Sequence, residues 1–154
     1  MIKDKAVDTK DVLKWRWAKG AATLLGDFGD PTTTDGYLLC LYDAGLPVAT
    51  IALPQGGVCA GKPCWRMKPT NYRYKDKELT PNGALVAQLK AGIAGKASAK
   101  VNGKGMNLPT PNPTAFTGPI DVQLQRADHG ICFGTTFSAP FKKNEGGVFA
   151  DTAD

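Results

Sequence analysis

The side chains with the most definite chemistry in this sequence are its four cysteines, Cys40, Cys59, Cys64 and Cys132. A zinc site needs closely paired cysteines, and only Cys59 and Cys64 are close, in the segment CAGKPC. An even number of cysteines is explained more simply by two disulfides than by a metal site or by free thiols. We therefore expect Cys59–Cys64 to close a turn and Cys40 to pair with Cys132 across two strands.

His129 is the single histidine, which limits the catalytic chemistry open to the chain. A nucleophilic serine or cysteine needs a base beside it, and no G-x-S-x-G motif is present. Glu78 and Glu145 are the only glutamates, and both lie in turn-like segments, which gives little support to a carboxylate pair for glycoside hydrolysis. We expect a protein that is not an enzyme.

One segment, GDFGDPTTTDG at 26–36, is a candidate metal site. Asp27, Asp30, Asp35 and three threonines offer the hard oxygen ligands that calcium prefers. The segment lacks the D-x-[DN]-x-[DN]-G pattern and a closing glutamate, and Asp-Pro and Asp-Gly pairs are also ordinary turn formers. Calcium is the one cofactor to consider here, and a plain turn is the alternative.

Aromatic and basic residues alternate in the middle of the chain, at NYRYKD. Trp65, Tyr72 and Tyr74 could form a platform on which sugar rings stack, flanked by Arg73 and Lys75. Such a platform requires rings on an exposed face. Packing of the same rings in the core or at its rim is the favoured alternative, because large aromatic residues are mostly buried.

A similar alternation occurs near the amino terminus, in LKWRW at 13–17. A period of two places Leu13, Trp15 and Trp17 on one side of a strand and Lys14 and Arg16 on the other. We expect the tryptophans to face the core and the basic residues to face solvent.

The elements that must position these residues are short strands. Period-two alternation recurs along the chain, and 18 glycines and 11 prolines are spread between the segments. This pattern predicts an all-β fold, an antiparallel β-sandwich of about nine strands, immunoglobulin-like or jelly-roll-like. The segment 84–91 fits either a strand or a short helix. We expect one domain over residues 12–143, with polar tails at 1–11 and 144–154 that serve as linkers or assembly segments.

The formal net charge of +5 is distributed unevenly. Residues 62–104 contain ten Lys or Arg against only Asp76 and Glu78. A basic region of this kind suits nucleic acid, an acidic polysaccharide or an anionic surface, or it forms the solvated outer faces of strands. We expect no specific recognition of nucleic acid.

The amino-terminal segment, MIKDKAVDTKD, is polar and is not a signal peptide. The chain is therefore either cytosolic, or a mature form or excised domain of an exported protein. The expected disulfides favour the second interpretation, because disulfides persist in oxidising compartments. No apolar run is long enough to span a membrane. We expect a secreted, extracellular or cell-surface location.

Four sequence features together resemble an uncharacterised secreted β-rich domain found in large extracellular proteins of myxobacteria and related environmental bacteria. They are the Trp-containing first strand, the turn CAGKPCW, the segment YRYKD and a cysteine in the last hairpin, here Cys132. The resemblance extends from about Leu13 to Phe141. It implies an extracellular β-rich setting, and it transfers no catalytic residues.

These observations predict a non-catalytic extracellular module with a structural or interaction role, in surface display, adhesion or self-assembly. Its expected partners are other protein modules or copies of itself, with a polysaccharide or an anionic surface as further candidates. The alternative is a carbohydrate-binding module that uses exposed aromatic rings.

Overall fold

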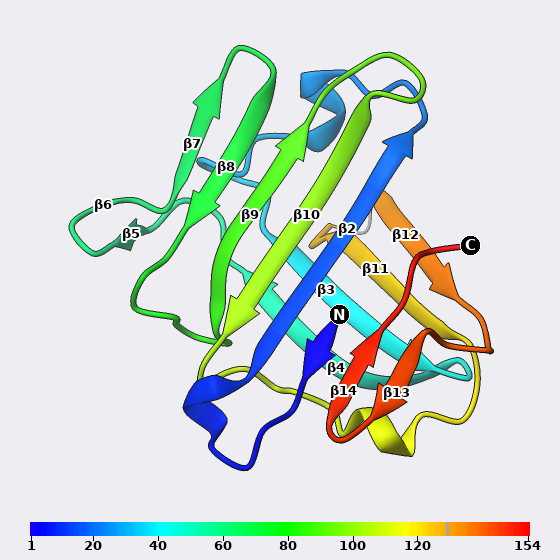
Figure 1. Cartoon of the computed structure of the whole chain (residues 1–154). Coiled ribbons are helices and arrows are strands. Elements are labelled where there is room, and N and C mark those ends of the chain that lie inside the picture. Colours follow the sequence, from blue (N-terminus) through cyan, green and yellow to red (C-terminus); the bar gives the residue numbers. More distant parts are fainter. Residues whose placement is uncertain (129) are drawn as a thin grey trace.

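Antiparallel β-strands make up nearly all the regular structure of the chain, in a computed structural model that describes residues 1–128 and 130–154 (Figure 1). The helical elements within these residues are three short 3₁₀ turns, η1 (Asp8–Lys10), η2 (Leu25–Phe28) and η3 (Pro113–Ala115). None of the helices in the described ranges is long and apolar enough to cross a membrane. The prediction of an all-β fold with antiparallel sheets is confirmed.

The larger sheet has eight strands, and each strand runs antiparallel to its neighbours. Their spatial order is β13 (Lys143–Glu145), β14 (Val148–Ala150), β1 (Ile2–Lys3), β2 (Val12–Gly20), β10 (Ala97–Lys104), β9 (Ala84–Lys90), β8 (Asn71–Lys75) and β7 (Trp65–Lys68). Because β1 pairs with both β14 and β2, the two ends of the chain meet inside this sheet.

The smaller sheet has four strands in the order β12 (Cys132–Phe137), β11 (Ile120–Arg126), β3 (Tyr37–Asp43) and β4 (Leu46–Leu53). The turn between β3 and β4 is built on Ala44 and Gly45, whose φ angles are 47° and 81°. A separate two-stranded hairpin consists of β5 (Val58–Cys59) and β6 (Lys62–Pro63), and we call it the disulfide hairpin.

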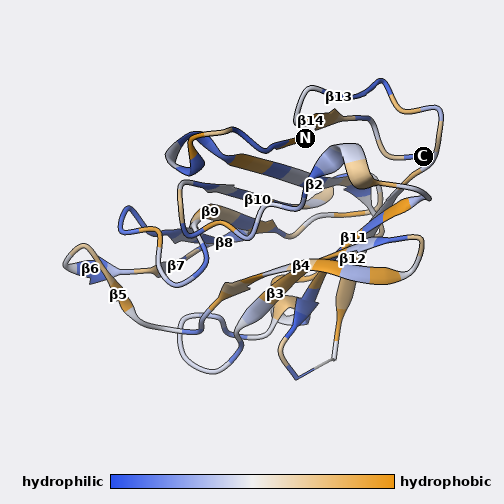
Figure 2. Ribbon diagram, turned by 90° about the horizontal axis from the view of Figure 1, so that it is seen from below, coloured by the Kyte–Doolittle hydropathy of each residue, from blue (hydrophilic) through white to orange (hydrophobic). Residues whose placement is uncertain are grey.

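The two main sheets lie face to face as two layers, and the hydrophobic core is between them (Figure 2). Aromatic contacts join the layers: the ring centroids of Trp17 and Phe133 are 4.9 Å apart, and those of Trp65 and Tyr37 are 6.2 Å apart. Trp15 is only 5% exposed, and its indole Nε1 donates a hydrogen bond of 2.7 Å to Thr135 Oγ1 on β12. The expectation that the first strand turns its tryptophans inward therefore agrees with the structure.

Two expectations about the elements are corrected, and one alternative is settled. The described residues form fourteen strands rather than about nine, because short pieces at the chain ends and in the disulfide hairpin also pair. Of the two alternatives for the segment 84–91, the strand is present, because Ala84–Lys90 form β9 and pair with both β8 and β10. The expected tails, 1–11 and 144–154, supply β1, β13 and β14 of the large sheet, and their residues Ile2 and Phe149 are buried in the core.

Candidate functional site

The outer surface of the large sheet is the most distinctive surface of the molecule. Strands β2, β7, β8, β9 and β10 contain no aspartate or glutamate. Their outward-facing basic side chains, which we call the cationic face, are Lys14, Arg16, Arg66, Lys68, Arg73, Lys75, Lys90, Lys100 and Lys104. All of them are exposed except Lys100, which is partly buried.

Strand alternation explains why these cations share one side. In β8, Tyr72 and Tyr74 are buried, whereas Arg73 and Lys75 are exposed. Successive side chains of a strand point to opposite faces, so aromatic residues on one side leave the basic residues on the other. The same alternation operates along the neighbouring strands.

The register of the sheet aligns several of these cations in one row. Arg16 lies opposite Lys100, which lies opposite Gln88; Gln88 in turn lies opposite Arg73, and Arg73 opposite Arg66. The row therefore crosses five strands and contains two directly opposed like-charged pairs. Like charges directly opposite each other destabilise a sheet. Nothing in the fold itself requires this arrangement, which makes the row a candidate for function.

The cations of this face have no ion-pair partners in the part of the chain that the structure describes. The salt bridges there involve only Arg126 and Lys143 as cations, and both lie outside the face. A shallow hollow of about 450 Å³ in the face is lined by Arg16, Lys90, Lys100 and polar neighbours. Asn71 also lines this hollow, and its buried Oδ1 has no hydrogen-bond donor. The surface thus offers cations and polar side chains together.

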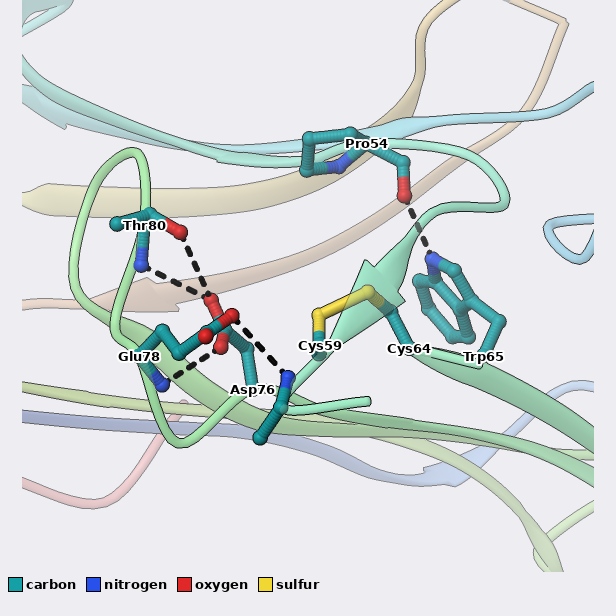
Figure 3. The surroundings of a disulfide bond; sticks show 8 residues. Pro54, Cys59, Cys64, Trp65, Asp76, Glu78 and Thr80 are labelled. Carbon is teal, nitrogen blue, oxygen red and sulfur yellow. Dashed lines mark hydrogen bonds between the residues drawn. A yellow bond between two sulfur atoms is a disulfide. The ribbon is translucent and has the colours of Figure 1, made fainter. Parts of the chain in front are cut away.

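The disulfide hairpin extends the basic surface at the β7 edge of the sheet. Cys59 and Cys64 are disulfide-bonded, with Cα atoms 5.0 Å apart, and Glu78 Oε2 accepts a hydrogen bond of 3.1 Å from Ala60 N (Figure 3). A hollow of about 270 Å³ beside the hairpin is lined by basic side chains and by hairpin residues. The basic residues of that lining are Lys62, Arg66, Lys75 and Lys77.

The turn that follows β8 is fixed by a buried carboxylate. Asp76 is fully buried and accepts hydrogen bonds from Glu78 N at 2.7 Å and from Thr80 N at 2.9 Å (Figure 3). Because the carboxylate oxygens of Asp76 accept these hydrogen bonds inside the turn, they are not available to the cations on the surface. The two acidic residues in the basic middle of the sequence therefore hold structure in place: Asp76 holds the turn, and Glu78 holds the hairpin.

The structure places the expected aromatic platform in the core. Trp65 is 2% exposed, Tyr72 5% and Tyr74 2%, so these rings do not form an exposed stacking surface. Trp65 Nε1 donates a hydrogen bond of 2.8 Å to Pro54 O (Figure 3). Burial raises the pKa of Tyr74 to about 12 and also raises the pKa of Tyr72. Their neighbours Arg73 and Lys75 do lie on the surface, in the cationic face.

The three aspartates of the candidate calcium segment do not converge on one point. Asp27 Oδ2 accepts from Leu24 N at 2.7 Å, and Asp35 Oδ2 accepts from Asp30 N at 2.7 Å. Asp30 accepts from the backbone and hydroxyl of Thr32, and the hydroxyl bond lowers its pKa. Within the described residues, no three acidic, cysteine or histidine side chains are grouped as a metal site. The carboxylates stabilise the turn itself.

The expected disulfide between Cys40 and Cys132 is absent, and both thiols are free. Cys40 lies on β3 and Cys132 on β12, and β11 runs between these two strands. Two strand spacings are about 10 Å, whereas the Cα atoms of a disulfide are at most about 7 Å apart. One disulfide, Cys59–Cys64, is therefore present instead of two. His129 lies outside the described residues.

The sequence alone indicates the basic region, but it does not indicate the row that the cations form. The excess of Lys and Arg at 62–104 indicated a positive surface, and alternation indicated that Arg73 and Lys75 point outward. The contribution of Arg16 to the same row was not foreseen, because it depends on the pairing of β2 with β10. The absence of Asp and Glu from five separate strands is the signal that could have found it.

Comparisons with protein-family models, with curated proteins and with solved structures find no match for this chain.

Proposed function

We propose that the protein is a non-catalytic extracellular interaction module, folded as an antiparallel β-sandwich, that holds an acidic polysaccharide on its cationic face. The row from Arg16 to Arg66 carries the proposal, because it places unpaired cations in line across five strands. Neighbouring strands are about 4.8 Å apart, so the row offers closely spaced positive charges to an extended, repeatedly charged polymer. Retention of opposed like charges is explained if a ligand neutralises them.

Two features favour a polysaccharide over nucleic acid as the ligand. Proteins that bind single strands without sequence preference stack bases on aromatic rings, and the rings of β7 and β8 face the core instead. The hollow in the face also combines Lys90 and Lys100 with the polar side chains of Asn71, Gln88 and Ser98. Carboxylates of a sugar polymer would meet the cations, and sugar hydroxyls would bond to the side chains of Gln88 and Ser98.

The disulfide supports an extracellular setting for this interaction. Cys59–Cys64 belongs to the kind of covalent link that persists in oxidising compartments. A role in surface display or adhesion follows from the same proposal, since a module that holds an anionic polymer would attach to a cell envelope or matrix. The described residues contain no grouped metal ligands, and no part of the proposal requires a cofactor.

Binding of the purified chain to polygalacturonate, a carboxylated polysaccharide, tests the proposal. Replacing Arg66 and Arg73 by Gln removes two cations from the row. Each basic residue near an anionic surface contributes about 1 kcal/mol, so we expect roughly tenfold to thirtyfold weaker binding at low salt. Uncharged dextran should not bind.

A matched control is the pair Lys10→Gln and Lys143→Gln, which changes the net charge equally but lies outside the face. We expect this variant to retain nearly all of its affinity. Equal weakening by the two variants would show that net charge alone attracts the polymer. Tighter binding of single-stranded DNA than of polygalacturonate would replace the polysaccharide by nucleic acid as the ligand.

A further inference from the structure

The hollow beside the disulfide hairpin brings together cations from three separate parts of the chain. Arg66 and Lys75 belong to β7 and β8, Lys62 belongs to the hairpin, and Lys77 belongs to the turn that follows β8. We call this space of about 270 Å³ the hairpin hollow. Lys62 and Lys77 are not part of the cationic face, so the hollow adds two cations that the strands of the sheet do not supply.

The backbone of β8 explains why its end contributes two lysines to the same surface. Lys75 N donates a hydrogen bond of 2.9 Å to Cys64 O, which continues the pairing of β8 with β7 to the base of the hairpin. Lys75 and Lys77 are exposed, whereas Asp76 between them is fully buried. Because the carboxylate points inward, the two lysines remain on the outer side, where Arg66 also lies.

The hairpin that forms the opposite wall is attached at its base and at its tip. The disulfide Cys59–Cys64 links its base to the start of β7, and Ala60 N in its turn donates a hydrogen bond of 3.1 Å to Glu78 Oε2 (Figure 3). Lys62 lies directly opposite Cys59 in the two-stranded pairing. In Figure 1 the hairpin projects beyond β7 at the edge of the large sheet. These attachments hold Lys62 at the hollow before any ligand arrives.

The charges of the hollow indicate what kind of group fits it. Within the described residues, none of its four cations forms a salt bridge, and Glu78 bonds to the hairpin backbone nearby. A sulfate or phosphate group has three free oxygens that point in different directions, so it can accept charge-assisted hydrogen bonds from several sides at once. A carboxylate has only two oxygens in one plane. Cations on a sheet, a hairpin and a turn therefore suit a tetrahedral oxyanion better than a carboxylate.

We propose that the hairpin hollow binds a sulfate or phosphate group carried by the polysaccharide, and that the disulfide holds the hairpin in place for this contact. The site rests on the polysaccharide ligand proposed above and adds a specific substituent to it. Arg66 ends the row of cations and also lines the hollow, so a polymer that follows the row reaches the hollow at the β7 edge. Carboxylates then lie along the row, and the tetrahedral group enters the hollow.

Chondroitin sulfate and chemically desulfated chondroitin test this site, because the two polymers share one backbone and the same carboxylates. We expect the full-length chain to bind the sulfated form more tightly. Replacing Lys62 and Lys77 by Gln should reduce this preference about tenfold, because it removes two cations near the sulfate, and it should change the affinity for the desulfated form far less.

The matched control is the pair Lys10→Gln and Lys143→Gln, which changes the net charge equally but lies outside the hollow. We expect this variant to keep the full preference for the sulfated polymer. An equal reduction in both variants would overturn the hollow as the binding site, and so would an unchanged preference in the Lys62→Gln, Lys77→Gln variant.

Small competitors identify the group and separate this site from the function of the whole face. Galactose 6-sulfate, galactose 6-phosphate or both should displace chondroitin sulfate, and the stronger competitor identifies the natural substituent. Galacturonate at the same concentration should not. Failure of both esters would overturn the oxyanion site. Displacement by an ester in a protein that does not bind desulfated chondroitin or polygalacturonate would keep the oxyanion site and contradict the proposed role of the row.

The double variant Cys59→Ser, Cys64→Ser tests the role of the disulfide. The hairpin belongs to neither main sheet, so we expect the circular dichroism spectrum and the binding of desulfated chondroitin to be retained. The preference for the sulfated polymer should fall about as far as in the Lys62→Gln, Lys77→Gln variant, because Lys62 is no longer held at the hollow. A folded double variant with its full preference would overturn this role of the disulfide.

Discussion

The outer faces of the two sheets differ in charge although the same alternation produces both. Five strands of the large sheet contain no acidic residue, and their outward side chains form the cationic face. The small sheet contains one basic residue in its strands, Arg126, which is paired with Asp128 at 2.7 Å. Its outward residues include Thr50, Cys40 and Gln123, which lie side by side in one row.

This difference shows which side chains the fold requires and which it does not. Both sheets bury similar aromatic and aliphatic side chains, so the inner faces are constrained by a shared core. The outer faces are free of that constraint, and only one of them has accumulated opposed like charges. The small sheet shows that an outer face without a row of cations is compatible with this fold. The cations of the large sheet therefore require an explanation outside the fold, such as a bound polyanion.

The largest expected effect concerns the core that both faces share. Trp65 is 2% exposed and packs against Tyr37 and Tyr74, whereas the next residue, Arg66, points outward. Removing a buried tryptophan leaves a cavity, so Trp65→Ala should lower the free energy of unfolding by about 3–5 kcal/mol in urea denaturation. Arg66→Ala should lower it by no more than about 0.5 kcal/mol. Similar losses in both variants would remove the distinction between inner and outer residues.

The second prediction concerns the thiols of the small sheet. The folded, non-reduced protein should contain two free thiols, Cys132 on the surface and Cys40 buried. Cys132 should react with iodoacetamide at least about tenfold faster, because a buried thiol reacts only when the structure opens locally. Partial burial, with a contribution from Cys40, raises the pKa of Cys132. Its labelling rate should therefore keep rising to a higher pH than that of an ordinary cysteine.

Mass spectrometry of the labelled protein separates the two sites, and Cys132→Ser provides the control. The fast phase should vanish in that variant. A protein that shows no free thiol before reduction would contain the Cys40–Cys132 disulfide after all, and the position of β11 between β3 and β12 would then be wrong.

The cysteines also show which features of the structure could be predicted from the sequence. Alternation within a strand is local, so it correctly placed Trp15 inside and Arg73 outside. The order of strands in a sheet depends on pairing between distant segments, and the sequence pattern contains no direct record of it. The Cys40–Cys132 pairing failed for that reason, whereas Cys59–Cys64 succeeded because the two cysteines are only five positions apart in the sequence and the short turn between them brings them together.

The features of the candidate site likewise divide into those that the sequence could predict and those that depend on strand pairing. The basic character of residues 62–104 was readable from composition, and the outward direction of Arg73 and Lys75 from alternation. The cationic row required the register between β2 and β10, which the sequence pattern does not contain. The segments that were expected to be linkers form strands because their apolar residues Ile2 and Phe149 are buried in the core. The polar residues around each of them made these segments look like tails in the sequence.

A third experiment transfers the charge pattern from one sheet to the other. Thr50 and Gln123 flank Cys40 in one row, much as Lys100 and Arg73 flank Gln88. Introducing Thr50→Lys and Gln123→Lys into the Arg66→Gln, Arg73→Gln background restores the net charge on the other side of the molecule. We expect polygalacturonate binding to recover by no more than about threefold, because each added cation has fewer positive neighbours than in the original row.

Affinity measured at low and at moderate salt provides the comparison with the parent chain. Full recovery would contradict the idea that the geometry of the row matters, and it would leave net charge as the only determinant. Partial recovery with a weaker salt dependence would support a ligand that spans several strands of the large sheet.

The smallest expected effect is on stability in the absence of any ligand. Arg73 lies directly opposite Arg66, so Arg73→Gln should relieve repulsion and raise the free energy of unfolding by about 0.2–1 kcal/mol. The gain should shrink as salt increases, since screening weakens interactions between exposed charges. Thr50→Gln on the small sheet should show neither the gain nor the salt dependence. A loss of stability in Arg73→Gln at every salt concentration would mean that the cation serves the fold, and the argument for a polyanion ligand would lose its main support.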